Sequence, residues 1–133
     1  TDGATLFYGQ GEKAGTTKNN GTDMWTVGGT YAVNALTMGI QQTSIDKSAA
    51  NADQDRLHMA VSYQVNDDLA ISYGMSTVEF ETPSSSDEED SGFSISYTMG
   101  SMSLVGSWLE SDNVGGTAAS DDSHTEIALS FAF

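Results

Sequence analysis

The chain has 133 residues, no cysteine, and 19 acidic against four basic side chains, for a formal charge of −15. This length fits a single domain over residues 1–133, and the lack of cysteine excludes disulfides and thiolate metal sites within it. The negative charge would repel nucleic-acid phosphates, so neither DNA nor RNA is an expected partner.

The chain begins Thr1-Asp2-Gly3 without an initiator methionine or a signal segment, from which we expect a processed or truncated product. No apolar run approaches the eighteen or more residues of a membrane-spanning helix. The more informative signal is an alternation of apolar and polar residues, the period of a β-strand with one apolar face.

In chain order, the alternating segments are residues 4–10, 25–33, 36–41, 57–65, 69–80, 93–99, 102–108 and 124–133. We therefore expect an all-β chain of about eight antiparallel strands. Asn34-Ala35, Asn66 to Asp68 and Gly100-Ser101 are short and polar enough to be hairpin turns.

The connections alternate in length, because the remaining ones, residues 11–21, 47–53, 82–91 and 112–123, are long and polar. Short turns at one rim and long loops at the other are typical of a transmembrane, antiparallel, up-and-down β-barrel. A soluble β-sandwich that acts as a binding module is the alternative, but it would have loops of mixed length at both ends. In the membrane barrel, the last strand would run towards the rim with the short turns, so the C-terminus would lie on the periplasmic side.

One face of the predicted strands carries large apolar side chains and no charge, which suits contact with lipid. The expected lipid-facing residues are Leu57, Met59, Val61, Tyr63, Leu69, Ile71, Phe93, Ile95, Tyr97, Ile127 and Leu129. The opposite face carries Ser, Thr, Ala and Gly instead of the Lys- and Glu-rich exterior of a soluble domain. Such small side chains would leave voids in a closed eight-stranded barrel. We therefore expect a wider, water-filled barrel, whose edge strands pair with strands outside this sequence or with other copies of it.

Four stretches carry a resemblance to a known family: WTVGGTY (residues 25–31), DRLHMAVSY (55–63), GFSISY (92–97) and LSFAF (129–133). They resemble the C-terminal half of the trimeric porins of Gram-negative bacteria, most nearly those of the alphaproteobacteria. The resemblance implies a sixteen-stranded barrel in the bacterial outer membrane, a homotrimer, and passive diffusion of small hydrophilic solutes and ions. It also implies an assembly signal at Phe131 and Phe133, with Leu129 and Ile127 before them.

Seven residues on the polar side of the predicted strands are candidates for lining the pore: Arg56, His58, Ser62, Gln64, Ser72, Glu79 and Glu126. For Arg56 the alternative is a rim residue paired with Asp53 or Asp55, which would contribute little if exposed. Glu79 reaches the polar side only if the strand is bulged near Ser76-Thr77, as the apolar Val78 and Phe80, out of phase with Met75, indicate.

Two acidic runs, Asp87-Glu88-Glu89-Asp90 and Asp121-Asp122, could hold calcium through carboxylate oxygens, although a solvated acidic loop is the simpler interpretation. A divalent ion could also bridge them to lipopolysaccharide phosphates. Apart from this calcium, no cofactor is expected. No nucleophile elbow, phosphate loop or metal-binding histidine pair is present, so a hydrolase with His58 or His124 as its base is a remote alternative.

The sequence therefore predicts a diffusion porin, and its acidic balance predicts a preference for cations. The alternative from another class is a small eight-stranded outer-membrane barrel with a structural or adhesive role and no pore.

Overall fold

The computed structural model describes residues 2–15 and 21–132. Its strands follow the order of the chain: β1 (Gly3–Lys13), β2 (Thr22–Val33), β3 (Leu36–Lys47), β4 (Gln54–Asn66), β5 (Leu69–Phe80), β6 (Glu88–Met99), β7 (Met102–Asp112) and β8 (Asp122–Phe131). A short 3-10 turn, η1 (Val114–Gly116), lies between β7 and β8. No helix in these residues has the length and apolar character needed to cross a membrane.

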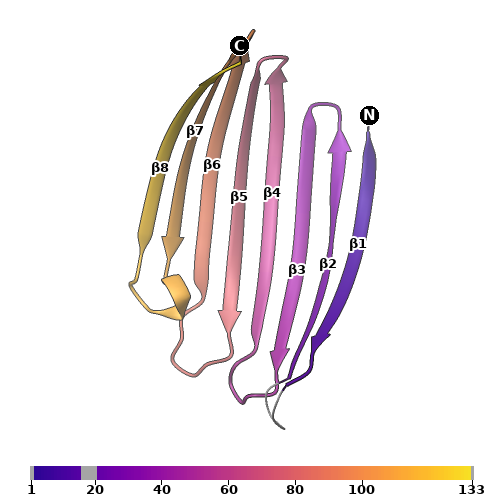
Figure 1. Ribbon diagram of the computed structural model, residues 1–133, viewed down its shortest axis with the longest axis vertical. Helices are drawn as coiled ribbons and strands as arrows, with labels where there is room; N and C mark the ends of the chain where they lie inside the picture. Colours follow the sequence, from indigo (N-terminus) through magenta and orange to yellow (C-terminus); the bar gives the residue numbers. More distant parts are fainter. Residues whose placement is uncertain (1, 16–20, 133) are drawn as a thin grey trace.

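Each strand pairs antiparallel with the next one, so the eight strands form a single up-and-down sheet (Figure 1). This confirms the predicted all-β fold and strand number. Within the described residues β1 and β8 each have one paired neighbour and do not pair with each other, so the sheet is an open one. The three short turns and both chain ends lie at one end of the sheet, and the long connections lie at the other (Figure 1).

The short turns are formed by the residues that the sequence indicated. Asn34 and Gly100 have φ angles of 52° and 60°, in the left-handed region that asparagine and glycine tolerate best. The Oδ1 atom of Asn66 accepts hydrogen bonds from the backbone N–H groups of Asp68 (2.9 Å) and Leu69 (3.0 Å). The polar residues of these turns therefore fix where β2, β4 and β6 end.

The strands extend further towards the long connections than the alternation predicted. Residues 88–90, expected in a loop, lie in β6 and pair with β5 and β7. Asp112 likewise belongs to β7, and Asp122 to β8. The apolar alternation ends before the ladder of backbone hydrogen bonds does, because most strands carry polar or charged side chains at this end, whereas β5 carries Val78 and Phe80 there.

The predicted bulge near Ser76-Thr77 is absent. β5 stays in register with both neighbours through these residues, and the irregularity between β4 and β5 lies at Gln64 to Asn66, beside the short turn. Because side chains alternate strictly along a regular strand, Glu79 lies on the face of Met75 and not on the face of Arg56.

The register defines two faces, which we call the apolar face and the polar face. The apolar face contains the positions aligned with Leu57, Ile71 and Ile95, and the polar face those aligned with Arg56, Ser72 and Ser94. The sheet buries almost nothing on itself, since Val78 is the one buried apolar side chain in the described part of the chain. Most of the other large apolar groups are exposed, as in Ile127 at 71%, and the rest are half-buried; a patch of this extent marks a surface that contacts lipid or protein.

Candidate functional site: the polar face of the sheet

The middle of the polar face is built from small side chains in cross-strand rows. Ser62, Ser72, Ser94 and Ser107 are successive partners from β4 to β7. The hydroxyl oxygens of Ser72 and Ser94 lie 2.7 Å apart and share a hydrogen bond. The row one step towards the long connections is smaller still, with Ala60, Gly74 and Gly92 followed by Leu109.

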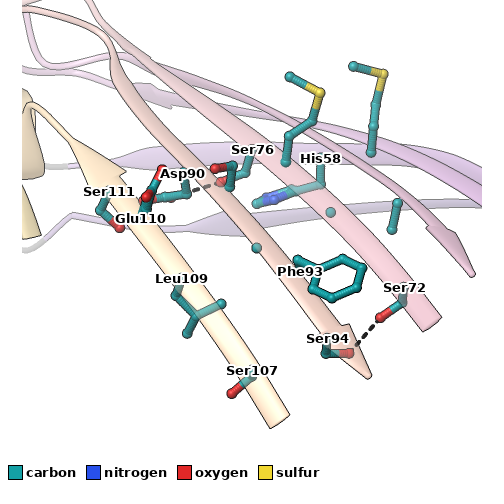
Figure 2. Close-up of a pocket in the computed structure, with 16 residues that line it drawn as sticks. His58, Ser72, Ser76, Asp90, Phe93, Ser94, Ser107, Leu109, Glu110 and Ser111 are labelled. Atoms are coloured by element: carbon teal, nitrogen blue, oxygen red, sulfur yellow. Dashed lines mark hydrogen bonds between the residues drawn. The ribbon is translucent and has the colours of Figure 1, made fainter. Parts of the chain in front are cut away.

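These small residues form the floor of a shallow groove of about 560 Å³ across β4 to β7. A Cβ atom on Gly92 would lie 2.7 Å from Cδ2 of Leu109, so the absence of a side chain lets Leu109 lean over the floor. His58, Ser76 and Asp90 are successive cross-strand partners at the side of the groove nearer the long connections. They project from three neighbouring strands beside one another (Figure 2).

The bonding within this row does not fit a hydrolase. The hydroxyl of Ser76 donates to Oδ2 of Asp90 at 2.8 Å. A serine nucleophile instead needs a hydrogen bond to a histidine that a carboxylate orients. His58 lies at one end of the row, so the order of groups is wrong for that relay.

Charged side chains on the polar face are separated by sign. The cationic groups in the described strands, Lys13, Lys47 and Arg56, all project from this face on β1, β3 and β4. The carboxylates of the same face belong to β6 and β8: Glu88, Asp90, Asp122 and Glu126. In the row that joins Arg56 on β4 to Glu88 on β6, only Val78 of β5 lies between the two signs, so the field of this wall runs across the strands.

Arg56 lies on the polar face as predicted, and the alternative ion pair is not formed. Its Nη2 donates to Oε1 of Gln54 at 3.1 Å, whereas its Nε is buried without a partner. Asp55 lies on the other face, and Asp53 accepts a hydrogen bond from the backbone N–H of Lys47 at 2.7 Å. No carboxylate of the described residues pairs with Arg56, so the guanidinium charge stays unneutralised at this wall.

The remaining pore-lining candidates divide into three cases. His58, Ser62, Ser72 and Glu126 are on the polar face. Gln64 is also on the polar face but lies beside the short turn, where its Nε2 donates to the carbonyl oxygen of Asn66 at 2.6 Å. Glu79 was assigned to the wrong side, because the bulge that would have turned it inwards does not form. On β8, Nε2 of His124 lies 3.8 Å from Oε2 of Glu126, and both side chains are about two-thirds exposed.

The first acidic run does not form a cluster. Asp87 lies in the β5–β6 connection, whereas Glu88 and Asp90 project from the polar face and Glu89 from the apolar face. In the second run, Oδ1 of Asp121 accepts a hydrogen bond from the backbone N–H of Asn113 at 3.2 Å. The described residues contain no group of three or more histidines and acidic residues that could hold a metal ion. Strand pairing thus separates carboxylates that are adjacent in the sequence.

The apolar face shows a vertical order that the sequence analysis missed. The predicted lipid-facing residues from Leu57 to Leu129 all lie on it, and so does Phe131; Phe133 is outside the described residues. Three tyrosines, Tyr31, Tyr63 and Tyr97, lie near the short turns. Trp25 and Trp108 lie nearer the long connections, at about the levels of the other two tyrosines, Tyr8 and Tyr73. Aromatic residues at two levels bound the apolar band of a membrane barrel.

Beyond this band, at the long-connection end, the apolar face carries what we call the outer carboxylate row: Glu12, Asp23, Asp46, Asp55, Glu79, Glu89, Glu110 and Asp112. Several members are direct cross-strand partners, such as Asp55 and Glu79. Like charges in that position repel each other, so these positions need water or cations around them. The row marks where the apolar band ends.

Residues 3–98 match a family model described as Gram-negative porin. No curated protein and no solved structure matches the chain.

Proposed function

Because the chain belongs to the Gram-negative porin family, and thus to the bacterial outer membrane, we propose that its sheet forms part of the wall of a water-filled channel. The channel allows passive diffusion of small hydrophilic solutes and ions. The observation that carries this proposal is the polar face, where small hydroxyl, glycine and alanine positions leave an open groove instead of a packed core. A wall of this kind lets a solute keep its water while it crosses the hydrocarbon layer.

The complete channel is wider than this sheet. An open edge cannot lie in lipid, because its unpaired N–H and C=O groups would have no hydrogen-bond partners. β1 and β8 therefore pair with further strands, from the rest of a longer porin chain or from another copy. A sixteen-stranded barrel, which is wide enough for an aqueous lumen, and a homotrimer are the assembly that we propose.

A preference for cations is the second part of the proposal. The polar face carries Glu88, Asp90, Asp122 and Glu126 against three cationic side chains. The whole sequence has a formal charge of −15. An excess of one sign along a narrow path raises the local concentration of ions of the other sign. Arg56 opposes this preference locally, which makes it a residue that sets the degree of selectivity.

The apolar face has two zones, the apolar band and the outer carboxylate row, and each contacts a different part of the membrane. The band from the short turns to the tryptophans contacts acyl chains, and the outer carboxylate row lies at the level of the headgroups. We propose lipopolysaccharide as the lipid next to this row, since the long loops of outer-membrane barrels are extracellular.

Two other functions have less support. The eight-stranded barrel without a pore requires β1 to pair with β8, and that pairing is absent from the described residues. An enzymatic role has less support because the row of His58, Ser76 and Asp90 is not ordered as a histidine-activated serine: the Ser76 hydroxyl donates to Asp90 instead. The proposal is therefore a channel and not an enzyme.

Planar-bilayer recording of the complete protein tests the proposal. We expect discrete conductance steps, a reversal potential of the cation-selective sign in a salt gradient, and swelling of liposomes in small sugars. The intact mass of the protein after extraction from outer membranes should exceed the 14.0 kDa of this chain. Purified, folded protein that produces no conductance steps would contradict the channel.

A further inference from the structure

The connection between β7 and β8, residues 113–121, lies over the polar face at the long-connection end of the sheet. The backbone N–H of Gly115 donates to Oε2 of Glu88 at 2.6 Å. Glu88 is the cross-strand partner of Val78, which is the partner of Arg56, so its side chain belongs to the polar face. A hydrogen bond to that carboxylate brings the connection onto the polar side.

A second contact supports the same position. Gly116 is buried, and a Cβ atom on it would lie 3.0 Å from Cδ2 of Phe80, a polar-face residue. Its φ angle of 77° also favours glycine. Val78, only 6% exposed, lies two residues before Phe80 on the same face. The connection thus covers the apolar residues Val78 and Phe80 at this end of β5, on the polar face.

The connection is held in one shape by its own hydrogen bonds. Asn113 has a φ angle of 55°, and its Oδ1 accepts from the backbone N–H of Ala119 at 3.1 Å. The N–H of Val114 donates to the carbonyl oxygen of Ser120 at 2.7 Å. The Asn113 side chain also donates to the carbonyl oxygen of Asp87 at 3.1 Å, which ties the connection to the neighbouring one.

We propose that the β7–β8 connection narrows the mouth of the channel, and that Glu88 is the positioning residue that keeps it folded inwards. The inference rests on the proposed function, since a narrowed mouth matters only if solutes pass. A hydrated solute that approaches from the long-connection end along β5 and β6 meets residues 114–116 before it reaches the groove. The connection therefore limits the size of the solutes that are admitted.

Three substitutions in the complete protein distinguish the effect of the hydrogen bond between Gly115 and Glu88 from the effect of the negative charge of Glu88. Glu88→Ala removes both, Glu88→Gln keeps an acceptor oxygen for Gly115, and Glu89→Ala removes a neighbouring charge from the apolar face. We expect Glu88→Ala alone to raise single-channel conductance and to admit larger sugars in liposome swelling. Glu88→Gln should keep the wild-type size limit while its cation preference falls.

The position of the connection has two readouts of its own. In Val114→Cys, in a sequence without other cysteines, a charged thiosulfonate reagent should cause a stepwise loss of conductance. Ala50→Cys in the β3–β4 connection is the matched control and should conduct as before. Hydrogen exchange at residues 113–120 should be faster in Glu88→Ala than in Glu89→Ala, and this measurement needs no conductance.

The outcomes separate the two proposals. A folded wild-type protein without conductance contradicts the channel itself. Wild-type conductance that is unchanged by Glu88→Ala, or by modification of Val114→Cys, overturns the inward-folded mouth and leaves the channel intact. Equal exchange rates in Glu88→Ala and Glu89→Ala would also overturn the role of Glu88.

Discussion

A positive charge placed in the middle of the apolar band tests whether this face of the sheet contacts lipid or solvent. On β6 the band lies between Met99 and Ser91, the position whose partner Glu110 begins the outer carboxylate row, and this is about 26 Å of strand at about 3.3 Å per residue. At a strand tilt of about 40° this corresponds to about 20 Å along the membrane normal. Ile95 lies at the centre of this span, on the apolar face. We expect Ile95→Arg to destabilise the folded protein in lipid by about 2–4 kcal/mol.

Ser96→Arg is the matched control. Ser96 adjoins Ile95 in the sequence but projects from the polar face, where an arginine side chain reaches water. Its effect on the free energy of unfolding should stay within about 0.5 kcal/mol. Reversible urea unfolding of the complete protein in liposomes, followed by tryptophan fluorescence, measures both variants. Equal destabilisation by the two substitutions, or a larger effect of Ser96→Arg, would refute the assignment of the faces.

Two further predictions follow from the charge and packing of the sheet. Arg56→Gln should raise the cation-to-anion permeability ratio and Glu126→Gln should lower it, as measured by the reversal potential in a salt gradient; ratios unchanged in both would show that these side chains do not line the path. Gly28→Ala should destabilise the protein by about 1–3 kcal/mol through overpacking, because its Cβ would lie 2.5 Å from Cζ of Phe7, as urea unfolding can test. Gly3→Ala, with nothing within 4 Å of its Cβ, should leave stability unchanged, and an equal effect of the two would contradict the packing argument.

The fold could be predicted from the sequence wherever the membrane imposes a constant environment. Between the short turns and the tryptophan level, each strand alternates between lipid and a polar interior, so the period of two appears directly in the sequence. The turns were predictable for a separate local reason, since Asn34, Asn66 and Gly100 each favour the turn conformation themselves.

The predictions failed where the environment changes along a strand. Val78 and Phe80 break the expected alternation, which in the sequence alone indicates a bulge. The ladder is in fact regular, and these residues are apolar because the distant β7–β8 connection covers that end of β5. A contact between residues 80 and 116 leaves no periodic signal in either segment. Glu79 was misassigned for the same reason.

The same change of environment explains how a chain with 19 acidic side chains can lie in a membrane. The apolar face carries carboxylates only at the long-connection end, in the outer carboxylate row, and the cationic side chains of the described strands all project from the polar face. An eight-stranded soluble sheet would have no reason to order its charges by both height and side. Two boundaries are needed to produce that order, one between lipid and headgroups and one between lipid and an aqueous interior. The charge pattern therefore supports a membrane wall with water behind it, independently of the apolar alternation.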